Sequence, residues 1–199
     1  MLNNNPIYRF YYGWWKNIDK TIFLFILLLF SLGLFFSLAS TSLIASDKLE
    51  TNTYFFFFKH LAYIFLGFTI LIFFSSLSEK NLFKLSFFLF FISLIFLILV
   101  PLIGTEINGA KRWLNLPFIP RFQPIELVKP FTIIILSMIL GSEKNVHVYY
   151  KYFLSFLAIV PVSFLLMLQP DIGQTLLIFL SWITLVFISG ISLIVFLTF

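Results

Sequence analysis

The sequence predicts an all-α protein, a polytopic bundle of about six transmembrane helices. Of its 199 residues, 61% are hydrophobic and only 11% are charged, and the mean hydropathy is +1.06. These values lie far outside the range of soluble globular domains. Long charge-free runs divide the chain, and several reach the roughly 20 apolar residues that a helix needs to cross a bilayer. We therefore expect an integral membrane protein with one membrane domain over residues 1–199.

Three spans are apolar enough to cross the membrane unaided. They are expected at about residues 21–45, 54–77 and 85–103. The segment before them carries three basic residues, but no small-residue cleavage site follows the first apolar run. That run is therefore expected to be a retained anchor and not a signal peptide. His60 falls in the first turns of the second span and is expected to be an interfacial side chain.

The remaining helices include polar residues or are separated by them. The charge-free run 131–142 is too short to cross, so a fourth helix must begin near Gln123. Proline and glycine in the segment 169–173 end one helix and start another. The last three helices are expected at about residues 123–142, 152–168 and 174–199.

The polar segment between the third and fourth spans is not explained by residence in lipid. An outer loop is expected over about residues 104–122, and it contains Lys111, Arg112, Trp113 and Arg121. The guanidinium fork and the ammonium point charge both suit a phosphate or a pyrophosphate. The alternative is nonspecific binding of anionic lipid headgroups, with Trp113 as a residue of the interfacial aromatic belt.

Polar side chains also occur at the helix ends beside this loop. Glu126 and Lys129 share one face of the fourth helix, where they would form either a structural ion pair or the wall of a wet cavity. Asp171 would either cap the sixth helix or contact a ligand. Gln123 and Gln169 each precede a proline near the same face and would offer amides to sugar hydroxyls. No Ser/His/Asp triad, zinc motif or phosphate loop is recognisable.

The distribution of basic residues indicates the orientation. Seven lie on the side of the N-terminus and six on the other side. When the four basic residues of the polar segment are set aside as functional, seven against two remain, which predicts a cytoplasmic N-terminus. The loop 104–122 is then extracytoplasmic. Because the basic residues are scattered among loops, no nucleic-acid partner is expected.

Three sequence blocks resemble the SEDS family of FtsW, RodA and SpoVE. They are NGAKRW at 108–113, QPIELVKP at 123–130 and QPDIGQT at 169–175. They are similar to the family's NGA-[KR]-RW, QPSE-x-x-K and QPD-x-G-T patterns, in the same order. The second and third blocks look more like the FtsW branch. Ile125 stands where the family usually has serine, and we expect only a local effect.

The resemblance implies a peptidoglycan glycosyltransferase that polymerises lipid II at the outer face of the bacterial cytoplasmic (inner) membrane during cell division. Undecaprenyl-pyrophosphate-linked glycan would be the substrate, a divalent cation (Mg or Mn) would assist, and a class B penicillin-binding protein and divisome proteins would be partners. The residues implied to bind pyrophosphate are Lys111, Arg112, Arg121 and Lys129. Those implied to line the cavity are Trp113, Gln123, Glu126, Gln169 and Asp171.

Family members have about ten helices, with a catalytic aspartate in an outer loop of the second half. This chain is therefore expected to be the N-terminal six-helix portion, with the catalytic residue beyond Phe199. Either the gene product is truncated or split, or a second polypeptide completes it, and the chain is not expected to be active alone. Two other functions remain open. A broken helix and charges at membrane depth also suit a lipid II flippase. Apolar helix faces would also suit a noncatalytic division scaffold that docks a penicillin-binding protein.

Overall fold

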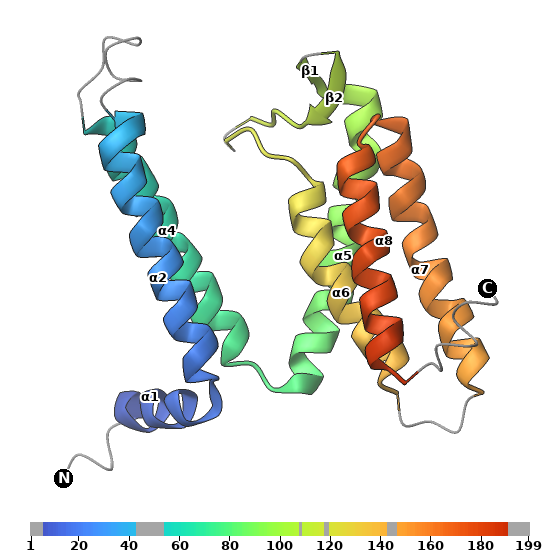
Figure 1. The fold of residues 1–199 in the computed structure, drawn as a ribbon, viewed down its shortest axis with the longest axis horizontal. Helices are drawn as coiled ribbons and strands as arrows, with labels where there is room; N and C mark the ends of the chain where they lie inside the picture. Colours follow the sequence, from blue (N-terminus) through green and yellow to red (C-terminus); the bar gives the residue numbers. More distant parts are fainter. Residues whose placement is uncertain (1–5, 43–53, 108, 118–119, 143–146, 191–199) are drawn as a thin grey trace. The chain divides into compact units, whose positions relative to one another are not determined.

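The computed structural model describes residues 6–42, 54–107, 109–117, 120–142 and 147–190 (Figure 1). The chain divides into two compact units, Met1–Ser78 and Glu79–Phe199. The single membrane domain expected over residues 1–199 stays a prediction. Charge-free runs reveal where helices cross a membrane, but they carry no information on which helices pack together.

The first unit consists of three α-helices and a π-helix. These elements are α1 (Pro6–Asn17), α2 (Lys20–Phe36), η2 (Ser37–Ser42) and α4 (Phe55–Ser75). Asp19 is the N-cap of α2, and its carboxylate accepts hydrogen bonds from the backbone N–H groups of Thr21 at 2.8 Å and Ile22 at 3.0 Å. The span expected over 21–45 is thus α2 continuing into η2, and residues 43–53 lie outside the described part.

Apolar side chains of α2 and α4 face outward along most of both helices, as expected of helices in lipid. Both helices are long and apolar enough to cross a membrane, and no residue of the best apolar window of either is buried within the protein. Edge-to-face rings join them, with Phe30 and Phe68 centroids 4.9 Å apart. His60 is half-buried and packs over Gly33, where a Cβ atom would lie 3.2 Å from the imidazole Nε2.

The second unit is a bundle of four helices with a small hairpin at one end (Figure 1). Its elements are α5 (Glu79–Ile103), β1 (Thr105–Ile107), β2 (Ala110–Trp113), α6 (Ile125–Leu140), α7 (Val148–Leu168) and α8 (Ile172–Ile188). Helices α5 and α7 begin earlier than the charge-free runs, because helical turns at an interface tolerate residues such as Glu79, Lys80 and Lys151. The C-terminal part of the last expected span, residues 191–199, lies outside the described part.

Buried apolar side chains from all four helices form the core of this bundle. Leu97 of α5, Val128 of α6, Val162 of α7 and Ile178 of α8 are at most 1% exposed. The expected all-α, polytopic membrane fold is confirmed: within the described ranges, four helices are long and apolar enough to span a membrane, and the shorter α8 is apolar too. The protein is a multi-pass membrane protein.

The loop expected at 104–122 contains a β-hairpin. Strands β1 and β2 pair antiparallel, with Glu106 opposite Lys111, and Gly109 supplies the positive φ of 78° that the turn requires. Farther along, Leu114 and Phe122 form a two-way backbone bridge. Leu114 is fully buried, and the ring of Phe122 packs edge-to-face on Phe96 of α5 at 5.7 Å. These contacts hold the hairpin, and with it Arg112, at the end of the bundle.

Candidate functional site

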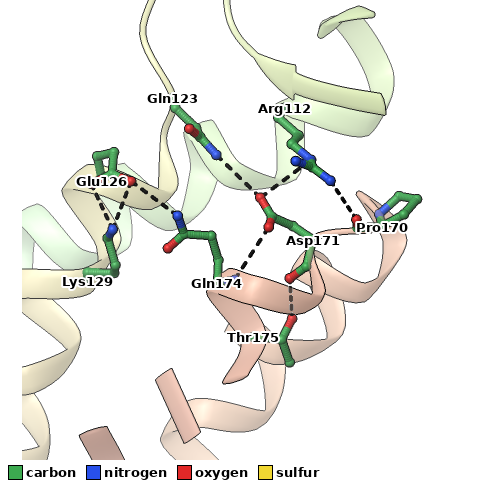
Figure 2. Close-up of polar contacts among 8 residues, drawn as sticks. All are labelled: Arg112, Gln123, Glu126, Lys129, Pro170, Asp171, Gln174 and Thr175. Atoms are coloured by element: carbon green, nitrogen blue, oxygen red, sulfur yellow. Dashed lines mark hydrogen bonds and ion pairs between the residues drawn. The ribbon is translucent and has the colours of Figure 1, made fainter. Parts of the chain in front are cut away.

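Side chains from three distant segments meet around the carboxylate of Asp171 (Figure 2). Arg112 extends from β2, Gln123 precedes α6, and Asp171 lies in the turn between α7 and α8. Asp171 Oδ2 lies 3.5 Å from Arg112 Nε and accepts a hydrogen bond from Gln123 Nε2 at 3.4 Å. Because Asp171 is only 7% exposed, these contacts compensate a charge that is largely shielded from solvent.

Arg112 holds both the backbone and the side chain of the α7–α8 turn. Its Nη2 donates a hydrogen bond of 2.7 Å to the carbonyl of Pro170, next to the ion pair with Asp171. The Arg112 side chain nevertheless keeps 38% of its surface exposed. The guanidinium therefore fixes the turn, while the side chain as a whole stays partly open to its surroundings.

Asp171 is also the N-cap of α8. Its Oδ1 accepts from the backbone N–H of Gln174 at 3.4 Å, and its carbonyl accepts from the Thr175 hydroxyl at 2.9 Å. The cap expected from the sequence is therefore confirmed, whereas contact of Asp171 with a ligand stays a prediction. One carboxylate oxygen caps the helix, and the other contacts Arg112 and Gln123.

Glu126 and Lys129 form an ion pair on the first turns of α6. Lys129 Nζ lies 2.8 Å from each carboxylate oxygen of Glu126. The pair is partly open, since the side chains of Lys129 and Glu126 are 19% and 54% exposed. A charged pair near the start of a membrane helix requires surroundings that water can reach.

Gln174 joins this pair to Asp171, a link that reasoning from the sequence missed. Its side-chain Nε2 donates to Glu126 Oε1 at 3.5 Å, while its backbone N–H caps on Asp171 (Figure 2). The available signal was its position three residues after Asp171, which places both on one face of α8. The polar network thus consists of Arg112, Asp171, Gln123, Gln174, Glu126 and Lys129, and we call it the outer network.

Gln169 belongs to the helix bundle and makes none of the outer network's hydrogen bonds. It is 2% exposed, and its Nε2 donates to the carbonyl of Leu97 in α5 at 3.3 Å. Its Oε1 is buried and finds no partner among the described residues. Gln169 therefore ties the end of α7 to α5.

The other residues singled out from the sequence lie on the hairpin and the loop after it. Lys111 and Arg121 are exposed, and within the described residues neither side chain forms an ion pair or a hydrogen bond. Trp113 is half-buried at the end of β2, with its backbone opposite Thr105. The structure thus leaves two cations available near the outer network without tying them to it.

A divalent cation fits the described carboxylates poorly. Nowhere in the described ranges do three His, Cys, Asp or Glu side chains gather as a metal site. Glu126 and Asp171 are both paired with cationic side chains. We therefore derive no step through a metal ion.

An apolar groove of about 480 Å³ runs along α8 from the turn that carries the outer network. It begins at Gly173, continues past Leu176 and Leu180 to Leu185, and has Ile133 of α6 on its wall. A polar site and an apolar groove are therefore contiguous on the same helix.

Residues 19–199 match the sequence model of the cell cycle protein family of FtsW, RodA and SpoVE. The probable peptidoglycan glycosyltransferase FtsW of Coxiella burnetii is 35% identical over 179 residues, which are 88% of this chain and 48% of that protein. The protein of the same name from Buchnera aphidicola is 33% identical, over 86% of this chain and 43% of its own length.

Two solved structures of related proteins are also similar to this chain. The crystal structure of the rod shape determining protein RodA of Thermus thermophilus has a TM-score of 0.61 and 31% identity, and the match covers 80% of this chain and 54% of that one. A chain of a peptidoglycan synthase complex has a TM-score of 0.59 and 32% identity, over 79% of this chain and 47% of its own. The chain spans about half the length of the curated relatives it matches.

Proposed function

Because the chain belongs to the SEDS family of FtsW, RodA and SpoVE, we propose that it forms part of a peptidoglycan glycosyltransferase of cell division. The substrate is lipid II, a disaccharide-peptide carried on undecaprenyl pyrophosphate. The product is a glycan strand made at the outer face of the cytoplasmic membrane. The relatives called probable peptidoglycan glycosyltransferase FtsW support this assignment.

The observation that carries the proposal is the outer network itself. Arg112 and Gln123, from two segments at least 48 residues earlier in the chain, converge on Asp171, and the apolar groove of α8 starts near the same turn. A lipid-linked pyrophosphate has the matching form, since its anionic head requires cations and its polyprenyl tail requires an apolar track.

Within this proposal the cations bind the substrate's pyrophosphate. Lys111 and Arg121 have no partner among the described residues, and the side chain of Arg112 stays partly exposed. Lys129 is held by Glu126 in a fixed position. Positive charge that is placed before the reaction stabilises the charge that develops on the leaving pyrophosphate.

The reaction is a displacement at the anomeric carbon of the growing glycan. The 4-hydroxyl oxygen of an incoming disaccharide forms a bond to that carbon, the bond from the carbon to the pyrophosphate oxygen breaks, and undecaprenyl pyrophosphate leaves. A general base must accept the hydroxyl proton. As the family resemblance implies, we assign that base to an aspartate in the half of the family's length that this chain does not span.

The proposal includes an orientation and a set of partners. The N-terminus is cytoplasmic and the hairpin β1–β2 is extracytoplasmic, in accord with the distribution of basic residues. A class B penicillin-binding protein and other divisome proteins are the partners, and the similarity to a chain of a peptidoglycan synthase complex supports the former.

The orientation can be tested directly because the chain contains no cysteine. A membrane-impermeant maleimide should label Glu106→Cys on the hairpin in intact spheroplasts. Lys80→Cys at the opposite end of the second unit should react only after the membrane is opened. The reverse pattern would contradict the orientation.

The activity is tested by polymerisation of fluorescent lipid II in proteoliposomes. The chain is reconstituted with a polypeptide that supplies the rest of the family's length, and glycan products are separated by electrophoresis. We expect glycan ladders from the pair. Movement of labelled lipid II across the bilayer without any polymer would indicate a flippase instead.

A further inference from the structure

The N-terminal helix α1 is an element that the proposed function does not use. It is a separate helix ahead of the first span, with only Ile18 and Asp19 between its end and the start of α2. In Figure 1 it lies across the ends of α2 and α4. Since α2 crosses the membrane from Lys20 onward, α1 must lie at the level where that membrane begins.

One face of α1 is aromatic. Tyr11, Trp14 and Trp15 occupy positions i, i+3 and i+4 and therefore share a face. Their rings pack together, with Tyr11 stacked on Trp15 at a centroid distance of 6.3 Å and an interplanar angle of 9°. This stack presents a continuous flat aromatic surface.

That aromatic face is turned toward the membrane-crossing helices. The Trp14 indole N–H donates a 2.7 Å hydrogen bond to Ser75 at the end of α4. Trp14 and Trp15 also pack edge-to-face on Phe23 in the first turn of α2, at 5.9 and 5.7 Å. These contacts fix the rotation of α1 about its own axis.

The opposite face carries Gly13 and Lys16, and Tyr12 lies between that face and the aromatic one. Tyr12 is 62% exposed, and a Cβ atom at Gly13 would meet nothing within 4 Å. Tyr11 on the aromatic face is still 56% exposed, so part of the face directed at the membrane is not covered by the protein. An aromatic face on the apolar side and a basic residue on the other are typical of a helix lying in a bilayer interface.

We propose that α1 is an interfacial helix that lies in the phospholipid headgroup layer at the start of α2, with Tyr11, Trp14 and Trp15 facing the acyl chains. Tryptophan and tyrosine favour this depth because each has an apolar ring and a polar group. The bond from Trp14 to Ser75 and the rings on Phe23 then lock α2 and α4 to the membrane surface at a fixed height.

Site-directed spin labelling of the full-length chain in phosphatidylethanolamine and phosphatidylglycerol vesicles tests this. Tyr11→Cys and Tyr12→Cys form a matched pair, since these neighbours are the same residue type and are both more than half exposed. Leu29→Cys, at a 65% exposed site in α2, serves as the reference for a label in the acyl region. Accessibility to oxygen is compared with accessibility to a water-soluble nickel chelate.

We expect the ratio of oxygen to nickel accessibility to be severalfold higher at position 11 than at position 12, and highest at position 29. A label at Gly13, on the face opposite the aromatic residues, should give a ratio no higher than the one at position 12. Equal, nickel-dominated ratios at positions 11 and 12 would place the helix in water and overturn the proposal. Equal, oxygen-dominated ratios would place it in the acyl region and overturn it as well. Neither result would bear on glycan polymerisation, so the two proposals can fail separately.

Discussion

Asp171 performs two tasks with one carboxylate. Oδ1 caps α8 through the Gln174 backbone, while Oδ2 receives Arg112 and Gln123. A helix N-terminus is a favourable place for a negative charge, and the ion pair with Arg112 acts on the same carboxylate. Because the loop, α6 and the α7–α8 turn all depend on this group, its charge fixes the geometry of the whole outer network.

Replacing Arg112 and Asp171 singly and together should reveal a coupling energy. We expect about 1 kcal/mol between Arg112→Ala and Asp171→Asn, a modest value because the Arg112 side chain is 38% exposed. The measurement is the free energy of unfolding in bicelles, followed by tryptophan fluorescence. Lys111→Ala, at the exposed neighbouring position, is the control and should couple to neither residue. Strict additivity of the Arg112 and Asp171 variants would contradict the ion pair.

The contact between the side chains of Gln174 and Glu126 can be tested by one substitution that breaks it and a second that should restore it. Gln174→Glu places a carboxylate at 3.5 Å from Glu126 Oε1, so it should lower the free energy of unfolding more than Gln174→Ala does. Adding Glu126→Gln should restore the amide-to-carboxylate contact with the partners exchanged. The same unfolding titration measures all three variants. Glu126→Gln alone is the control, because it also removes the ion pair with Lys129. If the effects of Gln174→Glu and Glu126→Gln simply add in the double variant, the side chains of these two residues do not interact.

Much of the outer network could be predicted from single residues, but its connections could not. Sequence motifs place Arg112, Gln123 and Asp171 at the same face of the membrane, and helical spacing pairs Glu126 with Lys129. The motifs contain no information on which partner each side chain selects. Gln174, which joins the two groups, depends on how α6 packs against α8, and that contact arises only from the tertiary fold.

At the scale of elements, membrane helices were easy to anticipate and amphipathic ones were not. A hydropathy argument detects runs such as residues 85–103, whereas α1 mixes aromatic and basic residues and contains no charge-free run. The hairpin β1–β2 was missed for a related reason. Its strands have three and four residues, too few for an alternating pattern to be recognised.

The close approach of α2 and α4 predicts that Gly33 and Gly67 differ in how well they tolerate substitution by alanine. A Cβ at Gly33 would lie 3.2 Å from His60 Nε2, whereas one at Gly67 would lie 3.7 Å from Phe30, an ordinary contact. Gly67→Ala should therefore raise the free energy of unfolding by up to about 1 kcal/mol through helix propensity. Gly33→Ala should give no such gain, because His60 must move.

Removing the His60 side chain, which lies against Gly33, provides the control for the comparison of the two glycines. Once His60→Ala is present, Gly33→Ala should stabilise the protein as much as Gly67→Ala does, in the same bicelle titration. An identical effect of Gly33→Ala with and without His60 would show that the imidazole does not limit the approach of the two helices.

For the whole molecule, the relevant fact is that the chain spans about half the length of its curated relatives. The described part nevertheless contains a packed four-helix unit with all three family motifs at one end. Under the proposed function, the groups that would bind an anionic, lipid-linked substrate are gathered in this part of the sequence. We expect the remaining length of the family to contribute the general base.

The central claim is that the outer network binds the pyrophosphate of lipid II. The rate of glycan polymerisation by variants of the network residues tests this claim most directly. Asp171→Ala and Lys129→Ala are each assayed with fluorescent lipid II beside the polypeptide that completes the family's length, and Lys80→Ala, at the start of α5, is the matched control. We expect each network variant to lower the rate of glycan formation by roughly 100-fold, the usual effect of removing a preorganised charge, and the control to retain full activity. Glycan strands that form at the unaltered rate after both network replacements would contradict the claim.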